Sequence, residues 1–234
     1  MNSIEQIVQD YERDGVVRVR GLFSSDQVAE TRRLLDDYIA TKLSSIPKGD
    51  YTLEADGVTV RNLWRIEQHD PRFVALATQP RLLELLGPLV HGEPVLIAIE
   101  TFNKQARVGS GVPHHQDNAY FCRTPPDVLT VWIAMDAATL ENGPVYYVKG
   151  SQHRMLPSRK SGVAGNSMGL AEPPTTPLEE QFCGTLERGD ALIHHCQTIH
   201  HSAPNKSEQS RLGFLLVFRG AHTERDPALQ AAYA

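Results

Sequence analysis

The sequence predicts an α+β fold in which strands form most of the core and helices pack on one sheet. Two observations support this prediction. In roughly the first 90 residues, apolar side chains recur at helical spacing beside helix-capping signals, whereas from Pro94 onward apolar and polar side chains alternate as in strands. Helices first and strands afterwards are typical of α+β domains, whose helices cover a barrel or a sandwich. At 234 residues we expect one domain, residues 1–234, with a mostly helical front over 1–90 and a β core over 94–220.

The helical front begins with a helix that Gly15 is placed to end, because glycine readily adopts the left-handed backbone that follows many helices. The alternating residues 16–20 then predict a short strand. Ser24 and Gln27 have the spacing of a capping box and predict the start of a second helix. The side chains expected on the buried faces are Ile4, Ile7, Val8 and Tyr11 in the first helix, and Val28, Thr31, Leu35 and Tyr38 in the second.

Two more helices are predicted to start at Asp70-Pro71 and at Gln79-Pro80, because proline fits the first turn of a helix. Gly87 is expected to close the second of these two helices. Residues 44–59, which lie ahead of both, have the composition of a loop, and no pattern in them indicates its path.

The β core is predicted from alternation over residues 95–104, 128–136 and 144–148, and from the strand-like stretches 191–199 and 212–218. Asn142-Gly143 is a strong turn signal between two of these strands. Residues 155–181 are rich in Gly, Pro and Ser and have no clear period. A segment of this length is usually a functional loop or an insertion. Its place between two histidine-rich stretches suggests a lid over a site, with a surface insertion as the equal alternative.

A candidate metal site lies in residues 113–121, where His115 and Asp117 are two residues apart. On an extended strand this spacing places both side chains on one face. An imidazole and a carboxylate that point the same way can occupy adjacent positions on a metal ion. A third ligand would complete the arrangement used by non-heme Fe(II) oxygenases. Because the chain has ten histidines, such a pair arises easily by chance, and the assignment depends on a third ligand and a co-substrate site.

Both are predicted near the C-terminus, where a turn-rich stretch separates two predicted strands. An antiparallel hairpin centred on Asn205 and Lys206 would place His200 opposite Arg211, with Cβ atoms roughly 5 Å apart. If His200 holds a metal, Arg211 would present a planar guanidinium to the far carboxylate of a dicarboxylic keto acid that chelates it. His194 is the strongest alternative ligand, but it lacks this partner.

These motifs resemble those of the phytanoyl-CoA dioxygenase family of Fe(II)/2-oxoglutarate-dependent oxygenases, and the resemblance extends over nearly the whole chain. The proximal motif is His115-Gln116-Asp117 with Tyr120-Phe121, and the distal motif is His200-x-Ser202 with Asn205 and Arg211. The other matching segments are residues 14–17, 21–24, 102–104, 132–135, 141–144 and 150–153. The departures are Gln105, where the family has proline, and Lys149 and the inserted Gln152 in its Pro-Gly-Ser-His turn.

The resemblance implies a double-stranded β-helix, also called a jelly roll, with the N-terminal helices packed on one sheet. It implies Fe(II) as the metal, with 2-oxoglutarate and O2 as co-substrates. The implied metal ligands are His115, Asp117 and His200. Arg211 and Ser202 would bind the 2-oxoglutarate carboxylate, although Ser202 alternatively only caps the turn.

Further side chains are expected to line the pocket, each with an ordinary sheet or surface role as its alternative. Those expected toward the cofactor are Asn103, Gln116 and Trp132, and those toward the substrate are His114, Tyr120, Arg61 and Lys104. His195, like His114, is expected in the pocket or just behind the ligands. The other cations that could reach an anionic or polar substrate are Arg65, Arg123, Arg159 and Lys160.

The resemblance therefore implies an oxygenase that hydroxylates its substrate, or oxidises it by desaturation or ring closure. Because the apolar residues show no pattern typical of a lipid tunnel, we expect that substrate to be a small polar metabolite of biosynthesis or catabolism. Succinate and CO2 would be released in the same reaction. The alternatives are a divalent-metal hydrolase and a metal-binding jelly-roll protein without activity. Arg211 argues against the hydrolase, because a site that activates water has no need of a carboxylate-binding fork.

Composition excludes several other classes of protein. A net charge of −5 and the lack of a Lys/Arg run argue against nucleic acid as a partner. The longest apolar run, residues 212–218, is too short to span a membrane, and residues 1–15 have no apolar signal segment. Three cysteines without framework spacing favour a reducing compartment, so we expect a cytoplasmic protein. The expected partner is a small-molecule substrate, and the expected state is a monomer or a weak homodimer.

Overall fold

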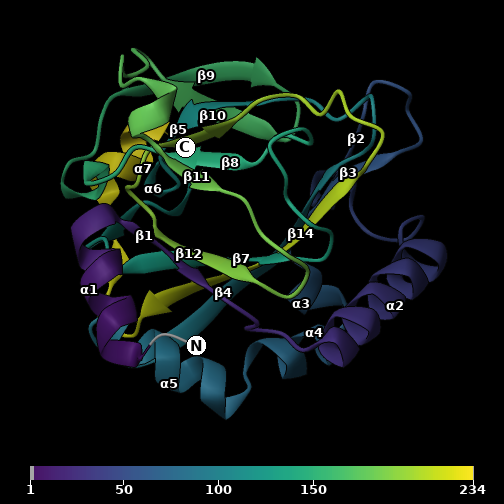
Figure 1. Ribbon diagram of the computed structural model, residues 1–234, viewed down its shortest axis with the longest axis horizontal. Coiled ribbons are helices and arrows are strands. Elements are labelled where there is room, and N and C mark those ends of the chain that lie inside the picture. Colours follow the sequence, from purple (N-terminus) through teal and green to yellow (C-terminus); the bar gives the residue numbers. More distant parts are fainter. Residues whose placement is uncertain (1–2, 234) are drawn as a thin grey trace.

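Two antiparallel sheets form the body of the protein in the computed structural model, which describes residues 3–233 (Figure 1). The seven-stranded sheet has the order β1-β12-β7-β14-β4-β3-β2, and the four-stranded sheet has the order β11-β8-β13-β5. The strands of the larger sheet are β1 (Val16–Val19), β2 (Tyr51–Leu53), β3 (Val60–Leu63), β4 (Pro94–Lys104), β7 (Val128–Ala134), β12 (Ala191–His195) and β14 (Arg211–Gly220). Those of the smaller sheet are β5 (Val112–His115), β8 (Val145–Tyr147), β11 (Phe182–Gly184) and β13 (His200–Ser202).

This arrangement is the double-stranded β-helix that the sequence resemblance implied. In the second half of the chain, consecutive strands alternate between the two sheets, since β11 and β13 belong to the smaller sheet and β12 and β14 to the larger. Side chains on the inner faces of both sheets therefore point into one shared space. Two short pairs complete the β structure, β9 (Ser158–Val163) with β10 (Asn166–Leu170), and β6 (Arg123–Thr124) with β15 (Glu224–Arg225).

Helices cover the outer face of the larger sheet, where α3, α4 and α5 lie below it in Figure 1. Phe214 and Leu216 of β14 share one buried apolar cluster with Tyr38 and Leu86 of the helices. None of the helices within residues 3–233 is long and apolar enough to cross a membrane. The helices are α1 (Ile4–Asp14), α2 (Ser25–Lys42), α3 (Ile66–His69), α4 (Pro71–Ala77), α5 (Pro80–Leu89), α6 (Asn118–Phe121) and α7 (Pro227–Tyr233).

The predicted helix boundaries at the front of the chain are confirmed. Gly15 follows α1 with a left-handed backbone, φ 73°, and donates its N–H to the Tyr11 carbonyl. Ser24 caps α2, and the reciprocal capping box with Gln27 is complete. Asp70 caps α4, with Pro71 in the first turn.

The predicted end of α5 at Gly87 is wrong, because the helix continues through Pro88 to Leu89. Leu86 and Leu89 are both buried in the core, and this packing keeps the last turn helical past the glycine. Residues 44–59, predicted to be a loop, contain a short 3-10 helix, η1 (Lys48–Asp50), and the edge strand β2. Strand β2 pairs with β3 in a hairpin, and the pairing of β3 with the distant strand β4 is what places this hairpin at the edge of the larger sheet.

The hairpin predicted between His200 and Arg211 is wrong. Strands β13 and β14 belong to different sheets, so His200 pairs with His115 and Tyr147, while Arg211 pairs with Lys104. In a jelly roll, the connection after β13 crosses from one sheet to the other instead of turning back within it. His200 and Arg211 are therefore brought together across the space between the sheets and not along a ladder.

Residues 155–181 are more regular than their composition predicted. They contain the β9–β10 hairpin and a 3-10 helix, η3 (Leu178–Glu180). The hairpin lies over the smaller sheet in Figure 1, and it contacts β5. The Tyr120 hydroxyl accepts the Met168 N–H at 3.0 Å and is 3.2 Å from the Met168 carbonyl, which ties the hairpin to α6. A lid role for this segment stays a prediction.

Candidate active site

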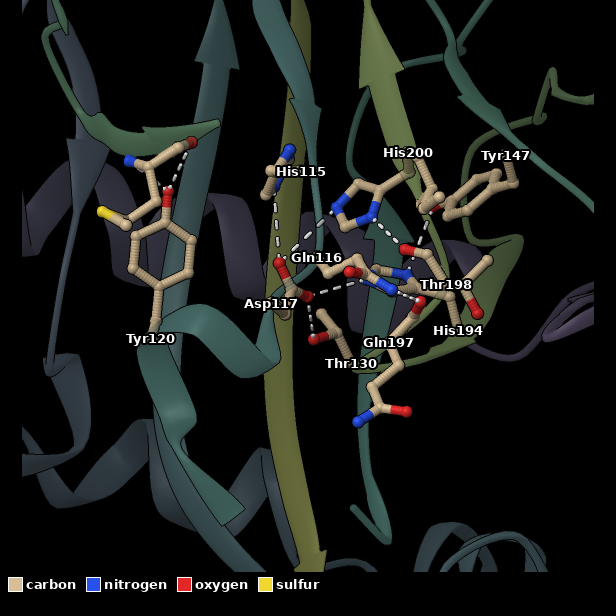
Figure 2. Close-up of polar contacts among 12 residues, drawn as sticks. His115, Gln116, Asp117, Tyr120, Thr130, Tyr147, His194, Gln197, Thr198 and His200 are labelled. Atoms are coloured by element: carbon tan, nitrogen blue, oxygen red, sulfur yellow. Dashed lines mark hydrogen bonds and ion pairs between the residues drawn. The ribbon is translucent and has the colours of Figure 1, made fainter. Parts of the chain in front are cut away.

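His115, Asp117 and His200 bring three potential ligand atoms together between the two sheets (Figure 2). The three atoms lie within 4.8 Å of one another. His115 Nε2 is 3.4 Å and His200 Nε2 is 3.6 Å from Asp117 Oδ1. Within residues 3–233 this is the only group of three or more His, Cys, Asp or Glu side chains that could hold a metal ion. Two imidazoles and one carboxylate on one side of a metal suit Fe(II) with open positions.

His115 and Asp117 do not lie on one extended strand, as the sequence predicted. Strand β5 ends at His115, and Asp117 already has a helical backbone, φ −63° and ψ −26°, at the start of α6. The expected common face of one strand is therefore wrong for this pair. The two histidines are instead direct cross-strand partners in β5 and β13, and the turn into α6 swings the carboxylate toward them.

Hydrogen bonds fix the orientation of both histidine rings. His115 Nδ1 is 2.9 Å from the Pro113 carbonyl oxygen, and His200 Nδ1 is 2.9 Å from the Thr198 carbonyl oxygen. A carbonyl only accepts, so each Nδ1 carries the proton and donates it. Each Nε2 then keeps its lone pair and points toward Asp117, which is the protonation state a metal ligand requires.

The second oxygen of Asp117 is held by two other side chains. Asp117 Oδ2 lies 3.2 Å from Thr130 Oγ1 and 3.1 Å from His194 Nε2. The other ring nitrogen of His194 is 3.3 Å from the Tyr147 hydroxyl. His194, the alternative ligand in the sequence, thus contacts the carboxylate from behind, and Figure 2 shows it on the side of Asp117 that Thr130 also occupies.

Electrostatics favour the metal-binding forms of these groups. Burial opposes the charged form of Asp117, but His200, His115 and His194 together hold its pKa well below the usual value. Burial, and then the neighbouring His115, lower the pKa of His200 well below the usual value. The site therefore presents an ionised carboxylate and a neutral imidazole at neutral pH, and neither must lose a proton to bind a cation.

We expect Thr130→Val to lower the affinity for Fe(II) by about tenfold, the lower end of the range for losing a partner of a metal ligand. Valine keeps the shape and the β-branch that suit strand β7, so the fold should be kept. The check is a competition titration of Fe(II) against a chromogenic chelator. Thr223→Val is the matched control, because the Thr223 hydroxyl is also buried but has no hydrogen-bond partner. Unchanged affinity in Thr130→Val would show that this hydroxyl does not support the ligand.

The triad opens into a cavity of about 400 Å³ between the two sheets. Its lining includes Trp132, Tyr147, Ser202 and Arg211, together with Trp64, Arg65, Glu100, Tyr120, Phe121 and residues 165–167 of the β9–β10 hairpin. Arg211 pairs with Lys104, and Glu100 pairs with Leu215 four residues further along the same ladder. A space of this size holds a keto acid together with a small organic molecule.

Arg211 is the most unusual of the side chains that line the cavity. It is 2 % exposed, and its Nε and Nη1 atoms have no hydrogen-bond partner within the described residues. Its guanidinium carbon lies 5.0 Å from the centre of the Trp132 ring, and Gly213 leaves room for that indole, since a Cβ there would come within 2.3 Å of it. Burial lowers the pKa of Arg211 to about 10, which leaves it charged at neutral pH.

A buried guanidinium without a counter-ion destabilises a protein unless an anion binds it. The fork of Arg211, which lines the same cavity as Ser202 and the triad, fits the carboxylate of a bound keto acid. The residues present therefore suit both the metal and 2-oxoglutarate.

Two of the residues expected near the cofactor lie outside the cavity. Asn103 donates from Nδ2 to the Val60 carbonyl at 3.1 Å and fastens β4 to β3. Gln116 is fully buried and bonds only backbone groups, donating to the Gln197 and Arg154 carbonyls. Asn103 thus joins two strands, and Gln116 holds two loops in place. Trp132 and Ser202 do line the cavity, as expected.

Of the four residues expected to contact substrate, one lines the cavity and three do not. Tyr120 lines the cavity, whereas Arg61 is buried against Glu54 at 3.4 Å, and Lys104 donates to the Ala203 carbonyl. Burial lowers the pKa of Lys104 to about 6. His114 stacks on His201 with ring centroids 3.8 Å apart and only supports the wall that His201 forms.

The remaining sequence candidates lie apart from the cavity, with one exception. His195 faces Tyr11 under helix α1, with ring centroids 6.2 Å apart. Arg65 lines the cavity, whereas Arg123, Arg159 and Lys160 do not.

Glu100 and Trp64 line the cavity and were not singled out in the sequence. A signal for Glu100 was present, because it is the one charged residue within the apolar alternation 95–102. Trp64 had no comparable signal, since its position depends on the pairing of β3 with β4.

Comparison with protein families matches residues 11–213 to the model of the phytanoyl-CoA dioxygenase (PhyH) family. Among curated proteins, the chain is 31% identical over 156 residues to phytanoyl-CoA dioxygenase domain-containing protein 1 of Mus musculus, covering 64% of this chain and 53% of that protein. The match thus spans about half of the mouse protein. It is 26% identical over 244 residues to L-proline trans-4-hydroxylase of Streptomyces griseoviridis, covering 94% of this chain and 89% of that one.

Among solved structures, the fold is similar to that of the non-heme alpha ketoglutarate dependent epimerase SnoN from nogalamycin biosynthesis. The TM-score is 0.75 at 23% identity, with 96% of this chain and 85% of that chain covered. At this level of identity the likeness concerns the fold alone.

Proposed function

The chain belongs to the phytanoyl-CoA dioxygenase family of Fe(II)/2-oxoglutarate-dependent oxygenases, and from this premise we propose that it oxidises a small polar metabolite at an unactivated carbon. Hydroxylation, desaturation and ring closure are all reactions of this type. The single observation that supports the proposal best is the unpartnered Arg211 guanidinium, which lies in the same cavity as the His115, Asp117 and His200 triad.

The protein's own part in such a reaction is to hold and orient the reactants. His115, Asp117 and His200 would hold Fe(II), and Arg211 with Ser202 would hold the far carboxylate of 2-oxoglutarate. Iron, 2-oxoglutarate and O2 together supply the oxidising power to break a C–H bond, with succinate and CO2 as by-products.

The walls of the cavity position the substrate and limit access of water. Aromatic side chains of both sheets and of α6 surround the space beside the triad, and the β9–β10 hairpin contributes residues 165–167. A dry, enclosed site strengthens every polar contact made to a bound substrate. The size of the cavity supports a metabolite and not a polymer, because 2-oxoglutarate must share the space of about 400 Å³.

The test is anaerobic titration of 2-oxoglutarate into Fe(II)-loaded protein, followed by a succinate-release screen against a panel of small metabolites. We expect a visible charge-transfer band on chelation and succinate release that depends on one class of substrate. Lack of the band would contradict the oxygenase and favour a divalent-metal hydrolase, which needs no keto acid.

A further inference from the structure

We propose that Glu100 is a specificity residue, whose carboxylate binds the cationic amine of the substrate in the cavity that Arg211 also lines, four residues along β4 from the strand partner of Arg211. The proposal rests on the function proposed above, because it names the class of substrate for the same site.

Strand β4 places the Glu100 side chain inside the protein. Its two chain neighbours face the other way, since Ile99 is fully buried in the core under the helices and the Thr101 hydroxyl accepts the Leu63 N–H. Glu100 therefore points to the inner face of the larger sheet, where it lines the cavity together with Phe102 and Leu215.

The Glu100 carboxylate has no partner in the part of the chain that the structure describes, since no hydrogen bond or ion pair is made to it. Glu100 is half-buried, whereas within residues 3–233 the fully buried carboxylates all have partners. Glu54 binds Arg61 and Ser110, Asp50 binds Arg65 and His69, and Asp190 binds Arg20. An unpaired carboxylate in an enclosed space is costly and indicates a group whose partner is a ligand.

The charges around Glu100 do not compensate for its burial. Burial, and then Asp117 just before α6 and Glu67 on α3, raise its pKa to about 8, with Arg65 opposing them. Arg65 is already bound by Asp50 and the Gly49 carbonyl, so its positive charge is largely balanced by Asp50 and does little to stabilise an ionised Glu100. A cation placed beside Glu100 would stabilise its ionised form, whereas an anionic substrate would meet repulsion.

The aromatic walls around Glu100 suit a cation better than an anion. Trp64 and Phe102 pack edge to face with ring centroids 5.3 Å apart, and Tyr120 and Phe121 line the same cavity. Aromatic faces attract an ammonium group through their negative π-surface, and the attraction grows as water is excluded. One carboxylate among aromatic rings is thus the chemistry that recognises a small organic amine.

Asn166 of β10 adds a second feature of the same kind. It is buried, it lines this cavity, and its Oδ1 has no hydrogen-bond partner within the described residues. An amide oxygen accepts hydrogen bonds, as a carboxylate does, and an amine carries N–H donors for both.

The test compares three probes of one shape, namely cyclohexylamine, cyclohexanol and cyclohexanecarboxylate. Their binding to the protein with Fe(II) and 2-oxoglutarate is measured without oxygen, by calorimetry or ligand-observed NMR at neutral pH. We expect wild type to bind the amine at least about tenfold more tightly than either other probe. Glu100→Gln should remove this preference and leave cyclohexanol binding unchanged.

Glu100→Gln is nearly isosteric and replaces a carboxyl group that has no partner within the described residues, so its melting temperature should equal or exceed that of wild type. Glu179→Gln, at an exposed site of η3, is the control for loss of one negative charge and should bind all probes as wild type does. Equal binding of amine and alcohol by wild type, no detectable amine binding, or an amine preference kept in Glu100→Gln would overturn the proposal. The charge-transfer band with 2-oxoglutarate reports on the oxygenase function separately, because Glu100 is not one of the three candidate ligands and lies four residues along the β4–β14 ladder from the level of Arg211.

Discussion

Replacing His200 by alanine is expected to remove most of the bound iron and to abolish turnover, and the same holds for His115 and Asp117. Each supplies one of the three convergent ligand atoms, and only Asp117 supplies a negative charge to balance the cation. With only two ligands left, the metal ion would dissociate into bulk solvent, and any ion that stayed bound would lack the fixed geometry that turnover requires. The measurement is iron content after anaerobic loading and gel filtration, together with succinate release.

His194→Ala distinguishes a ligand from a group that supports one. Because His194 contacts the rear oxygen of Asp117, we expect the variant to keep iron, with an affinity about 10- to 100-fold lower. His222→Ala, at an exposed site bonded to Asp127, should load iron like wild type. Full loading of His200→Ala with loss of iron in His194→Ala would reverse the two assignments.

Replacing Arg211 by alanine is expected to raise the half-saturating concentration of 2-oxoglutarate by about 30- to several-thousand-fold. Truncating one partner of a buried charge pair costs about 2–5 kcal/mol, at about 1.4 kcal/mol for each tenfold change. Iron content should change little, since Arg211 is not one of the three ligands. The measurement is anaerobic titration of 2-oxoglutarate, followed by the charge-transfer band.

Arg211→Lys should recover only part of the loss, because an ammonium group cannot form the bidentate pair of a guanidinium with a carboxylate. Arg219→Ala is the matched control. Arg219 lies on the same strand outside the cavity and donates only to backbone carbonyls, so its removal should leave the 2-oxoglutarate affinity as it is. An unchanged affinity in Arg211→Ala would mean that the far carboxylate binds elsewhere, while the metal site would stand.

Much of the local structure could be predicted from the sequence, because the forces that set it are local. The capping box at Ser24, the left-handed glycine after α1 and the proline at the start of α4 depend on residues a few positions apart. The residue types of the metal site could also be predicted, since an imidazole and a carboxylate two positions apart remain close whether the chain is extended or turns.

Longer-range features could not be predicted in this way. The hairpin drawn from the sequence placed Arg211 beside His200, and in the structure Arg211 reaches the same cavity from the opposite sheet. Gln116 and Asn103 lie within the motifs, yet both donate to backbone carbonyls far away in the sequence, and neither side chain lines the cavity.

The sequence by itself determined the helical front, the strand-rich core and the chemical types of the three candidate ligands, because periodicity, caps and short spacings are properties of neighbouring residues. Only the tertiary structure decided that His115 and His200 both face Asp117 Oδ1, that His194 holds Oδ2, and that Glu100 lines the same cavity without a partner among the described residues. The physical reason is that a side chain's partners are set by which strands lie opposite each other, and the crossing between the two sheets leaves no local trace in the sequence.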